Sequence, residues 1–380
     1  MSGDPEQPQI HIAVEDQSSG SDDEPYLRDG PVVESSEYLL FVPVTDTLLG
    51  TQTGINVERF LQTAVAIAAD NDGKVLLLGI ESVSSDTTLE TVREYVRTGQ
   101  PADGESTDIV ETIETREEQL TAMTAVAQDL HTNVSVSGAL RVVTDITEGI
   151  LDVLDDGTEA AVLLPRGAGL EEGWLLRRST VDRILSDAEC NVFVENMGIE
   201  PGGTGLYVPA VEDHTVASLA ESEGDSIDSI LLPVGSGPHS ALAAEAARAV
   251  ARAAGASVTV LHVVPTDASA ETRSDGEDLL QFAAYVLGSD VTVETVLREA
   301  PDTAAAIVEA ATAHDFISIG APAAKGRLES LVFESVQQTL SAESDATVLM
   351  SRDVDRTSRS LYYRWKRGIE AIEDESESPD

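Results

Sequence analysis

Short apolar runs alternate with segments of helical period along most of the chain, and the whole alternation occurs twice. The first series opens at Tyr38–Val44 and closes at Asn191–Glu195, and the second runs from Ser229–Val234 to Ala346–Met350. The strand-like runs are apolar along their length, which is typical of parallel strands covered on both faces. The sequence therefore predicts two tandem α/β domains, each built on a five-stranded parallel sheet.

Two sequence echoes indicate that the series arose by duplication. FVPVTD corresponds to LLPVGS at the first strand, and DITEGILDVL corresponds to DTAAAIVEAA before the fourth. Val44 and Asp145 are 101 positions apart, whereas Val234 and Asp302 are 68 apart, so the first half carries 33 extra residues. We expect most of them at 82–108, where TGQPADGEST is loop-like.

The helices and strands are expected where the periods and the capping residues agree. In the first series we expect strands at Tyr38–Val44, Lys74–Ile80, Val134–Val143, Ala160–Leu164 and Asn191–Glu195, with helices at Val57–Ala69, Ile109–Leu130, Ile146–Leu154 and Thr180–Ser186. In the second we expect strands at Ser229–Val234, Ser257–Val264, Val291–Leu297, Phe316–Ile319 and Ala346–Met350, with helices at Ser240–Ala254, Glu277–Leu287, Asp302–Ala313 and Leu331–Leu340.

Composition sets the domain boundaries. Residues 1–35 are rich in Asp, Glu, Ser, Gly and Pro, have few apolar anchors, and are predicted to be a disordered acidic tail. The remaining segments are a first domain at 36–197, a linker at 198–228 in which LYVPAV is a candidate edge strand, a second domain at 229–351, a basic aromatic helix at 352–373 and an acidic tail at 374–380.

The chain is strongly acidic throughout. With 23 Lys and Arg against 69 Asp and Glu, its formal charge is -46, which disfavours nucleic acid and anionic lipid as partners of the bulk surface. This balance resembles a halophilic cytosolic proteome, since concentrated salt shortens the Debye length to roughly 3 Å; the alternative is an ordinary acidic protein. The start of the chain has no signal-peptide pattern, and we expect a cytoplasmic protein.

Three stretches of the second half, ILLPVGSGPHS, APDTAAAIVEAATAHDFISIG and GAPAAKGRLESLVFESV with the closing strand ATVLM, resemble the universal stress protein family. The resemblance covers Ser229–Met350 well and Tyr38–Glu195 more faintly. It implies doubly wound sheets of the adenine-nucleotide α-hydrolase-like type. It also implies that the two copies pair within the chain as a pseudo-dimer, or that two chains form a homodimer.

ATP-binding members of that family carry a loop of pattern G-x2-G-x9-G-[ST], in which backbone N–H groups approach the phosphates. Here Gly320 takes the first glycine position, the second falls on Ala323, and Gly326 and Lys325 follow. With a loop one residue longer than the pattern, Ser335 takes the hydroxyl position and Glu334 replaces the last glycine. A carboxylate there would repel a triphosphate, so the resemblance implies a degenerate site.

The first strand departs from the family as well, because Gly235 stands where ATP-binding relatives commonly carry Asp. Ser240 is expected to be the N-cap of the helix that follows. The ligand implied is ATP or AMP, with a cyclic dinucleotide or another small anion left open and no cofactor required. The candidate binding residues are Val234, Gly235, Ser236, Gly320, Lys325, Gly326 and Ser335.

The first half offers only a weaker anion site in PRGAGLEEGWLLRRST, where Pro165 stands in place of the leading glycine. The candidates are Arg166, Arg177, Arg178 and Ser179. The alternative is that these arginines pair with Glu171 and Glu172 in solvent.

No other constellation indicates catalysis or metal binding. The six histidines are scattered, and neither a GxSxG nor a Walker A sequence occurs. The single cysteine, Cys190, is predicted to be a buried strand residue. We therefore name no catalytic residue and no metal ligand, and a non-enzymatic role is favoured over an enzyme.

The end of the chain is locally basic, with six Lys and Arg between Arg352 and Arg367 among three aromatic residues. On a helix, one apolar stripe is formed by Tyr362, Trp365, Ile369 and Ile372. We expect this stripe to pack either on the domain or on its pseudo-symmetric mate. The sharper hypothesis is docking to a protein or membrane surface. The docking candidates are Tyr362, Arg364, Trp365, Lys366 and Arg367.

Three functions remain open at this point. The first is a tandem regulatory or scaffold protein of the stress response that binds partners and a nucleotide or anion without efficient turnover. The second is a slow ATPase, and the third is a cytosolic regulator that docks on a membrane transporter. In each case we expect a protein partner and no nucleic acid.

Overall fold

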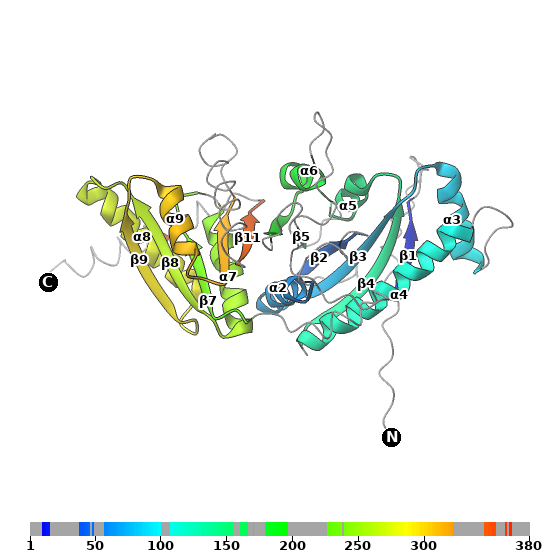
Figure 1. Cartoon of the computed structure of the whole chain (residues 1–380), viewed down its shortest axis with the longest axis horizontal. Coiled ribbons are helices and arrows are strands. Elements are labelled where there is room, and N and C mark those ends of the chain that lie inside the picture. The colour runs from blue at the N-terminus through cyan, green and yellow to red at the C-terminus, as the bar shows by residue number, and fades with distance from the viewer. Residues whose placement is uncertain are drawn as a thin grey trace, which may run out of the picture. The chain divides into compact units, whose positions relative to one another are not determined.

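A computed structural model describes residues 10–15, 38–45, 48, 57–99, 107–131, 133–154, 160–165, 170, 179–196, 226–237, 239–321, 346–354, 362, 365 and 366. The described residues up to Val192 belong to one compact unit, and those from Phe193 onward belong to a second. Each unit is an α/β structure on a parallel sheet (Figure 1).

The first unit is organised around β2, from which strands extend in both directions. Its strand order is β1-β4-β3-β2-β5, and each of these neighbours is parallel to the next. The next strand in the order, β6, lies where the two units divide. The elements are β1 His11–Val14, β2 Leu39–Val44, α2 Val57–Asp70, β3 Lys74–Ser82, α3 Asp86–Thr98, α4 Thr107–Leu130, β4 Ser135–Val143, α5 Ile146–Leu154, β5 Ala160–Pro165 and α6 Thr180–Asp187. Strand β6, Asn191–Asn196, begins in this unit and ends in the second.

The second unit repeats this plan around β7. Its strand order is β11-β10-β7-β8-β9, again parallel throughout. Because the chain runs outward from β7 through β8 to β9 and then crosses back to β10, the sheet is doubly wound. The elements are β7 Ser229–Pro233, α7 Ser240–Ala254, β8 Ser257–Val264, α8 Ala270–Leu287, β9 Val293–Glu299, α9 Thr303–Ala311, β10 Phe316–Gly320 and β11 Thr347–Arg352.

Helices cover both faces of the second sheet. Ile317 of β10 packs in a buried apolar cluster with Ile307 of α9, whereas the hydroxyl of the next residue, Ser318, donates to the Ala243 carbonyl of α7 at 2.7 Å. Successive residues of a strand point to opposite faces, so α7 and α9 lie on opposite sides of the sheet. This two-sided burial explains why the strands are apolar along their length.

A repeated side-chain arrangement confirms the duplication expected from the second echo. Arg141 on β4 donates to the carbonyl of Gly149, eight residues on, at 2.9 Å, and to the carboxylate of Asp152, eleven residues on, at 3.1 Å. Arg298 on β9 makes the same two bonds at the same two spacings, to the Ala306 carbonyl at 3.3 Å and to the Glu309 carboxylate. Each arginine thus ties a strand to the helix that follows it.

The insertion at 82–108 is only partly the loop that its composition suggested. Helix α3 occupies Asp86–Thr98, because the Ser85 side chain accepts a bond from the Thr88 N–H at its start and Gly99 ends it with φ 66°. Its buried residues are Leu89 and Val92. The extra length therefore adds a capped, amphipathic helix to the first unit.

The predicted disordered tail at 1–35 is wrong for His11–Val14. These residues form β1, which pairs with β4 in parallel and continues the sheet beyond the predicted five strands. The Glu15 carboxylate accepts bonds from the N–H and hydroxyl of Thr144 at 2.7 and 2.8 Å and fixes the end of the strand. These four residues are ordered as a strand because they pair with the edge of β4.

Helix α8 is longer than the sequence predicted. It begins at Ala270 instead of Glu277, with Ser269 as its N-cap, and continues through Gly276. A Cβ on Gly276 would lie 2.7 Å from Cδ2 of His262 and 2.8 Å from Cδ1 of Leu297, so glycine allows α8 to lie close against β8 and β9. The helix expected at Leu331–Leu340 lies outside the described residues. Cys190 is buried, immediately before β6.

Candidate functional site

The reversal of strand order places the carboxyl ends of β7 and β10 side by side, where open α/β sheets bind their ligands. Gly320 ends β10 at this point. A Cβ on Gly320 would lie 2.9 Å from the carbonyl carbon of His239 and 3.1 Å from the nitrogen of Ser240. Glycine is therefore needed to bring the end of β10 against the start of α7.

The loop between β7 and α7 is held at both ends by hydrogen bonds. The Ser240 hydroxyl donates to the carbonyl of Gly235 at 2.9 Å and accepts from its N–H at 3.3 Å. At the strand end, Nδ1 of His262 donates to the carbonyl of Val234 at 2.8 Å, because a carbonyl can only accept. The backbone that would face a ligand is thus fixed in place.

The expected N-cap at Ser240 is wrong by one position. The N-cap of α7 is His239, whose side chain makes no capping bond. Its Nδ1 instead accepts a bond from the N–H of Asp353, just after β11, at 3.0 Å. Ser240 was predicted from local residue type, but the structure uses its hydroxyl to brace the loop across five residues.

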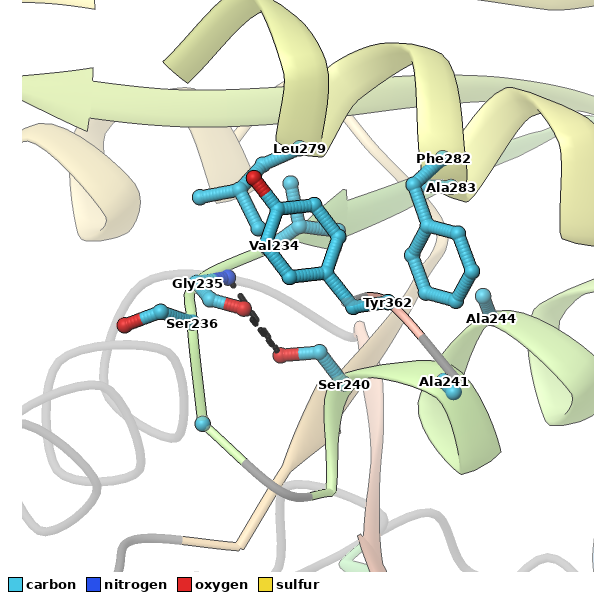
Figure 2. Close-up of a pocket in the computed structure, with 11 residues that line it drawn as sticks. Val234, Gly235, Ser236, Ser240, Ala241, Ala244, Leu279, Phe282, Ala283 and Tyr362 are labelled. Atoms are coloured by element: carbon cyan, nitrogen blue, oxygen red, sulfur yellow. Dashed lines mark hydrogen bonds between the residues drawn. The ribbon is translucent and has the colours of Figure 1, made fainter. Parts of the chain in front are cut away.

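A small pocket lies directly above this loop (Figure 2). The β7–α7 loop forms one side of it, the first turns of α7 another, and α8 with the ring of Tyr362 the rest. The space left free is about 20 Å³, which is room for about one water molecule. The lining residues are Val234, Gly235, Ser236, Gly237, Ser240, Ala241, Ala244, Leu279, Phe282, Ala283 and Tyr362.

The absence of a side chain at Gly235 is not imposed by packing. A Cβ built on this residue meets no atom of its surroundings within 4 Å, and its φ lies outside the left-handed region. A β-carbon is therefore tolerated at this position, where the family resemblance implies an aspartate. The chain supplies no carboxylate here.

Aromatic residues from the end of the chain close the pocket. The rings of Tyr362 and Phe282 meet edge to face with centroids 5.5 Å apart, and Trp365 lies 5.6 Å from Phe282. The Lys366 ammonium lies 2.8 Å from a carboxylate oxygen of Asp275 and 2.7 Å from one of Asp278. The described residues of this stripe, Tyr362, Trp365 and Lys366, therefore pack on their own domain.

The predicted site residues are only partly brought together. Val234, Gly235 and Ser236 line the pocket, and Gly320 stands at the adjoining strand end. In the first unit, Ser179 is the N-cap of α6 and accepts from the N–H of Asp182 at 3.1 Å. The other candidates lie outside the described residues, namely Lys325, Gly326, Ser335, Arg166, Arg177, Arg178, Arg364 and Arg367.

Sequence reasoning did not assign Leu279, Phe282 and Ala283 of α8 to this site. They are separated from the β7–α7 loop by more than forty residues, and their spacing is that of an ordinary buried helix face. Only the packing of α8 beside α7 brings them over the strand end. Tyr362 was noticed as part of the aromatic stripe, but its place in the pocket had no local signal.

Two further properties concern the described residues as a whole. Within them, no group of three or more His, Cys, Asp and Glu side chains is arranged to hold a metal ion. Helices long and apolar enough to cross a membrane do not occur in the part of the chain that the structure describes.

The fold and the site together define a doubly wound α/β domain with a ligand crevice at its switch point. The sequence profile of the universal stress protein family matches residues 226–352, the stretch of the second unit that holds β7 to β11. The chain therefore carries a domain of the universal stress protein family. The expected family and fold class are confirmed for this unit, and the first unit shares the doubly wound strand order.

Solved structures resemble the chain at low identity. A universal stress protein from Archaeoglobus fulgidus DSM 4304 is 15% identical over 84% of this chain and 97% of its own, with a TM-score of 0.48. The cytoplasmic domain of a prokaryotic cation chloride cotransporter is 14% identical over 86% and 99%, with a TM-score of 0.47. A universal stress protein in complex with cAMP is 16% identical over 33% and 97%, with a TM-score of 0.27. Likeness at this level carries no information on function, and no curated protein matches the chain.

Proposed function

We propose that the second unit is a regulatory module that binds an adenine nucleotide at the carboxyl ends of β7 and β10, without efficient turnover. The observation that carries the proposal is the pocket at the switch point, which is lined by the backbone of Val234–Gly237. The family of residues 226–352 supports an adenine nucleotide as the ligand.

The geometry suits recognition of a planar base and a sugar better than chemistry on a phosphate. The pocket wall formed by Ala241, Ala244 and α8 is apolar, and the side opposite is formed by the β7–α7 loop, whose Gly235 backbone is bonded to the Ser240 hydroxyl. Apolar walls with a few placed polar groups are the usual composition of small-molecule sites.

Two residues argue against efficient turnover of ATP. Gly235 provides no carboxylate to the nucleoside, although a Cβ at this position meets no neighbour within 4 Å. Glu334, in the segment that follows β10, stands where the family pattern has its last glycine, and its charge would repel a triphosphate. AMP, which carries less charge, suits such a site better than ATP does.

Isothermal titration of the full chain in molar KCl with Mg²⁺, against ATP, AMP and cyclic AMP, tests the proposal directly. The informative variant is Gly235→Asp, with Gly235→Ala as its matched control. Both add a Cβ to the same open space, but only the aspartate adds an acceptor for ribose hydroxyls. A hydrogen bond to a charged group contributes about 1.5–3 kcal/mol, so affinity should rise roughly tenfold to a hundredfold.

The alanine control should bind as the parent chain does. Absence of heat for the parent chain and also for Gly235→Asp, with both thermal transitions intact, would contradict nucleotide binding. Tighter binding by the alanine control as well would show that the gain comes from backbone restriction and not from the carboxylate.

The two alternative functions stay predictions. A slow ATPase would need turnover in the same titration mixtures, measured as released phosphate. Regulation of a membrane transporter through the basic aromatic stripe is less well supported. Its residues Tyr362, Trp365 and Lys366 already contact α8 of their own unit.

A further inference from the structure

We propose that Tyr362 is an internal competitor of the nucleotide, so that binding requires the end of the chain to leave the pocket. The inference rests on the nucleotide site proposed above and assigns its regulation to the chain itself. The first observation is that Tyr362 lines the same pocket as Val234, Gly235 and Ser236 (Figure 2).

The side chain of Tyr362 is buried in surroundings that would also suit the aromatic base of a ligand. Only 9% of the surface of Tyr362 is exposed, although this residue comes ten positions after the end of β11. Figure 2 shows the ring between Leu279 on one side and Phe282 on the other, and Val234 also lines this pocket. An edge-to-face partner and aliphatic walls are the surroundings that an aromatic base also prefers.

The small free space beside Tyr362 supports competition between its ring and a nucleotide. About 20 Å³ remains beside Tyr362, enough for one water molecule but not for a purine. The remaining walls belong to packed elements, since the loop is tied to Ser240 and His262, and α8 lies close against β8 at Gly276. Tyr362 is the lining group at the end of the chain, so its departure is the simplest way to open the pocket.

Charge holds the ring in place. Lys366 bonds to two carboxylates of α8, Asp275 and Asp278, and these bonds raise its pKa above the ordinary lysine value. Its side chain is 27% exposed, so salt weakens the pair without abolishing it. Nearer the sheet, the bond from the Asp353 N–H to His239 joins the same segment to the start of α7. The contact is therefore reversible and sensitive to ionic strength.

Under this proposal the chain exists in a closed form, with Tyr362 in the pocket, and an open form that can bind nucleotide. A nucleotide that binds only the open form shows an apparent dissociation constant raised by the inverse of the open fraction. If the open form makes up about one tenth or less of the chain, removing Tyr362 should tighten binding at least tenfold. Raising the KCl concentration should tighten binding by the parent chain and leave the opened variant less affected.

The experiment compares AMP and ATP titrations of the full chain with those of Tyr362→Ala and Lys366→Glu. Tyr285→Ala is the matched control, because Tyr285 also belongs to this unit but is 71% exposed on α8. A rescue variant combines Lys366→Glu with Asp278→Lys and restores one ion pair with its charges exchanged. In a Trp174→Phe background, the emission of Trp365 reports directly whether the segment leaves Phe282 when nucleotide is added.

We expect at least tenfold tighter binding for Tyr362→Ala and Lys366→Glu, parent affinity for Tyr285→Ala and for the rescue variant, and a red shift of Trp365 emission on ligand addition. Equal nucleotide affinity in all variants, without a Trp365 shift, overturns the competition and leaves the nucleotide site standing. Absence of binding in every variant, including the opened ones, overturns both. The two failures are thus distinguishable.

Discussion

Replacement of Gly320 by alanine tests the reasoning on which the site depends. The new Cβ would lie 2.9 Å from the carbonyl carbon of His239, 3.0 Å from its oxygen and 3.1 Å from the nitrogen of Ser240. Ordinary carbon–carbon contacts are about 3.5–4.0 Å, so the start of α7 must move by roughly half an ångström or more. All three neighbours are backbone atoms and cannot swing aside as a side chain would.

The magnitude follows from two opposing effects. Overpacking a well-packed site costs about 1–3 kcal/mol, and alanine recovers about 0.4–1 kcal/mol by restricting the unfolded chain. The net loss of unfolding free energy should be about 0–2.6 kcal/mol, and the loss relative to a glycine-to-alanine change without overpacking should be about 1–3 kcal/mol. For a unit of this size, each kcal/mol corresponds to roughly 2–4 °C, so we expect a melting temperature about 2–12 °C below that of such a control.

Scanning calorimetry is the suitable assay, because two units need not unfold in one transition. Gly235→Ala is the control, since it makes the same chemical change where a Cβ meets no neighbour within 4 Å. It should leave the transition unchanged or raise it slightly. If Gly320→Ala is as stable as Gly235→Ala, the close approach of β10 to α7 is not real, and the description of the switch point fails with it.

Other predictions concern the two units separately. Burial, and then the bond to Glu114, raise the pKa of Tyr95 from 10.0 to about 12. The folded state therefore keeps a proton that the unfolded state loses, and stability should fall as pH rises from 10.0 to about 12; Tyr95→Phe should flatten that part of a denaturation series against pH. Asp315→Ala removes one oxygen that accepts from the N–H and hydroxyl of Ser229 and the N–H of Asp228, and should cost about 1–3 kcal/mol in chemical denaturation. Asp302→Ala removes the N-cap of α9 and should cost about 1 kcal/mol in the same assay, whereas Asp302→Asn should keep most of the cap.

Much of the architecture could be predicted from local pattern. The alternation of apolar runs and helical periods yielded every described strand except β1 to within about two residues, because a strand buried on both faces must be apolar along its length. The echo between DITEGILDVL and DTAAAIVEAA was confirmed by the matching bonds of Arg141 and Arg298. Gly235 and Gly320 were recognised by comparison with a family pattern, and the structure places both at the switch point.

Long-range contacts decided the rest. His11–Val14 is too short and too isolated to be recognised as a strand, and it is ordered by the edge of β4, more than a hundred residues away. Ser240 looks like a cap in sequence, yet His239 takes that position because Gly320 brings β10 against the helix start.

The pocket shows most clearly which features follow from the sequence and which follow from tertiary packing. By itself the sequence determined a glycine-bearing loop after β7 and an aromatic stripe at the end of the chain, since both follow from residue type and spacing. Only the tertiary structure brought Tyr362 to that loop, between α7 and α8, because the contact joins segments more than 120 residues apart that share no local pattern. Periodicity reports which face of an element is buried, whereas packing alone decides what is buried against it.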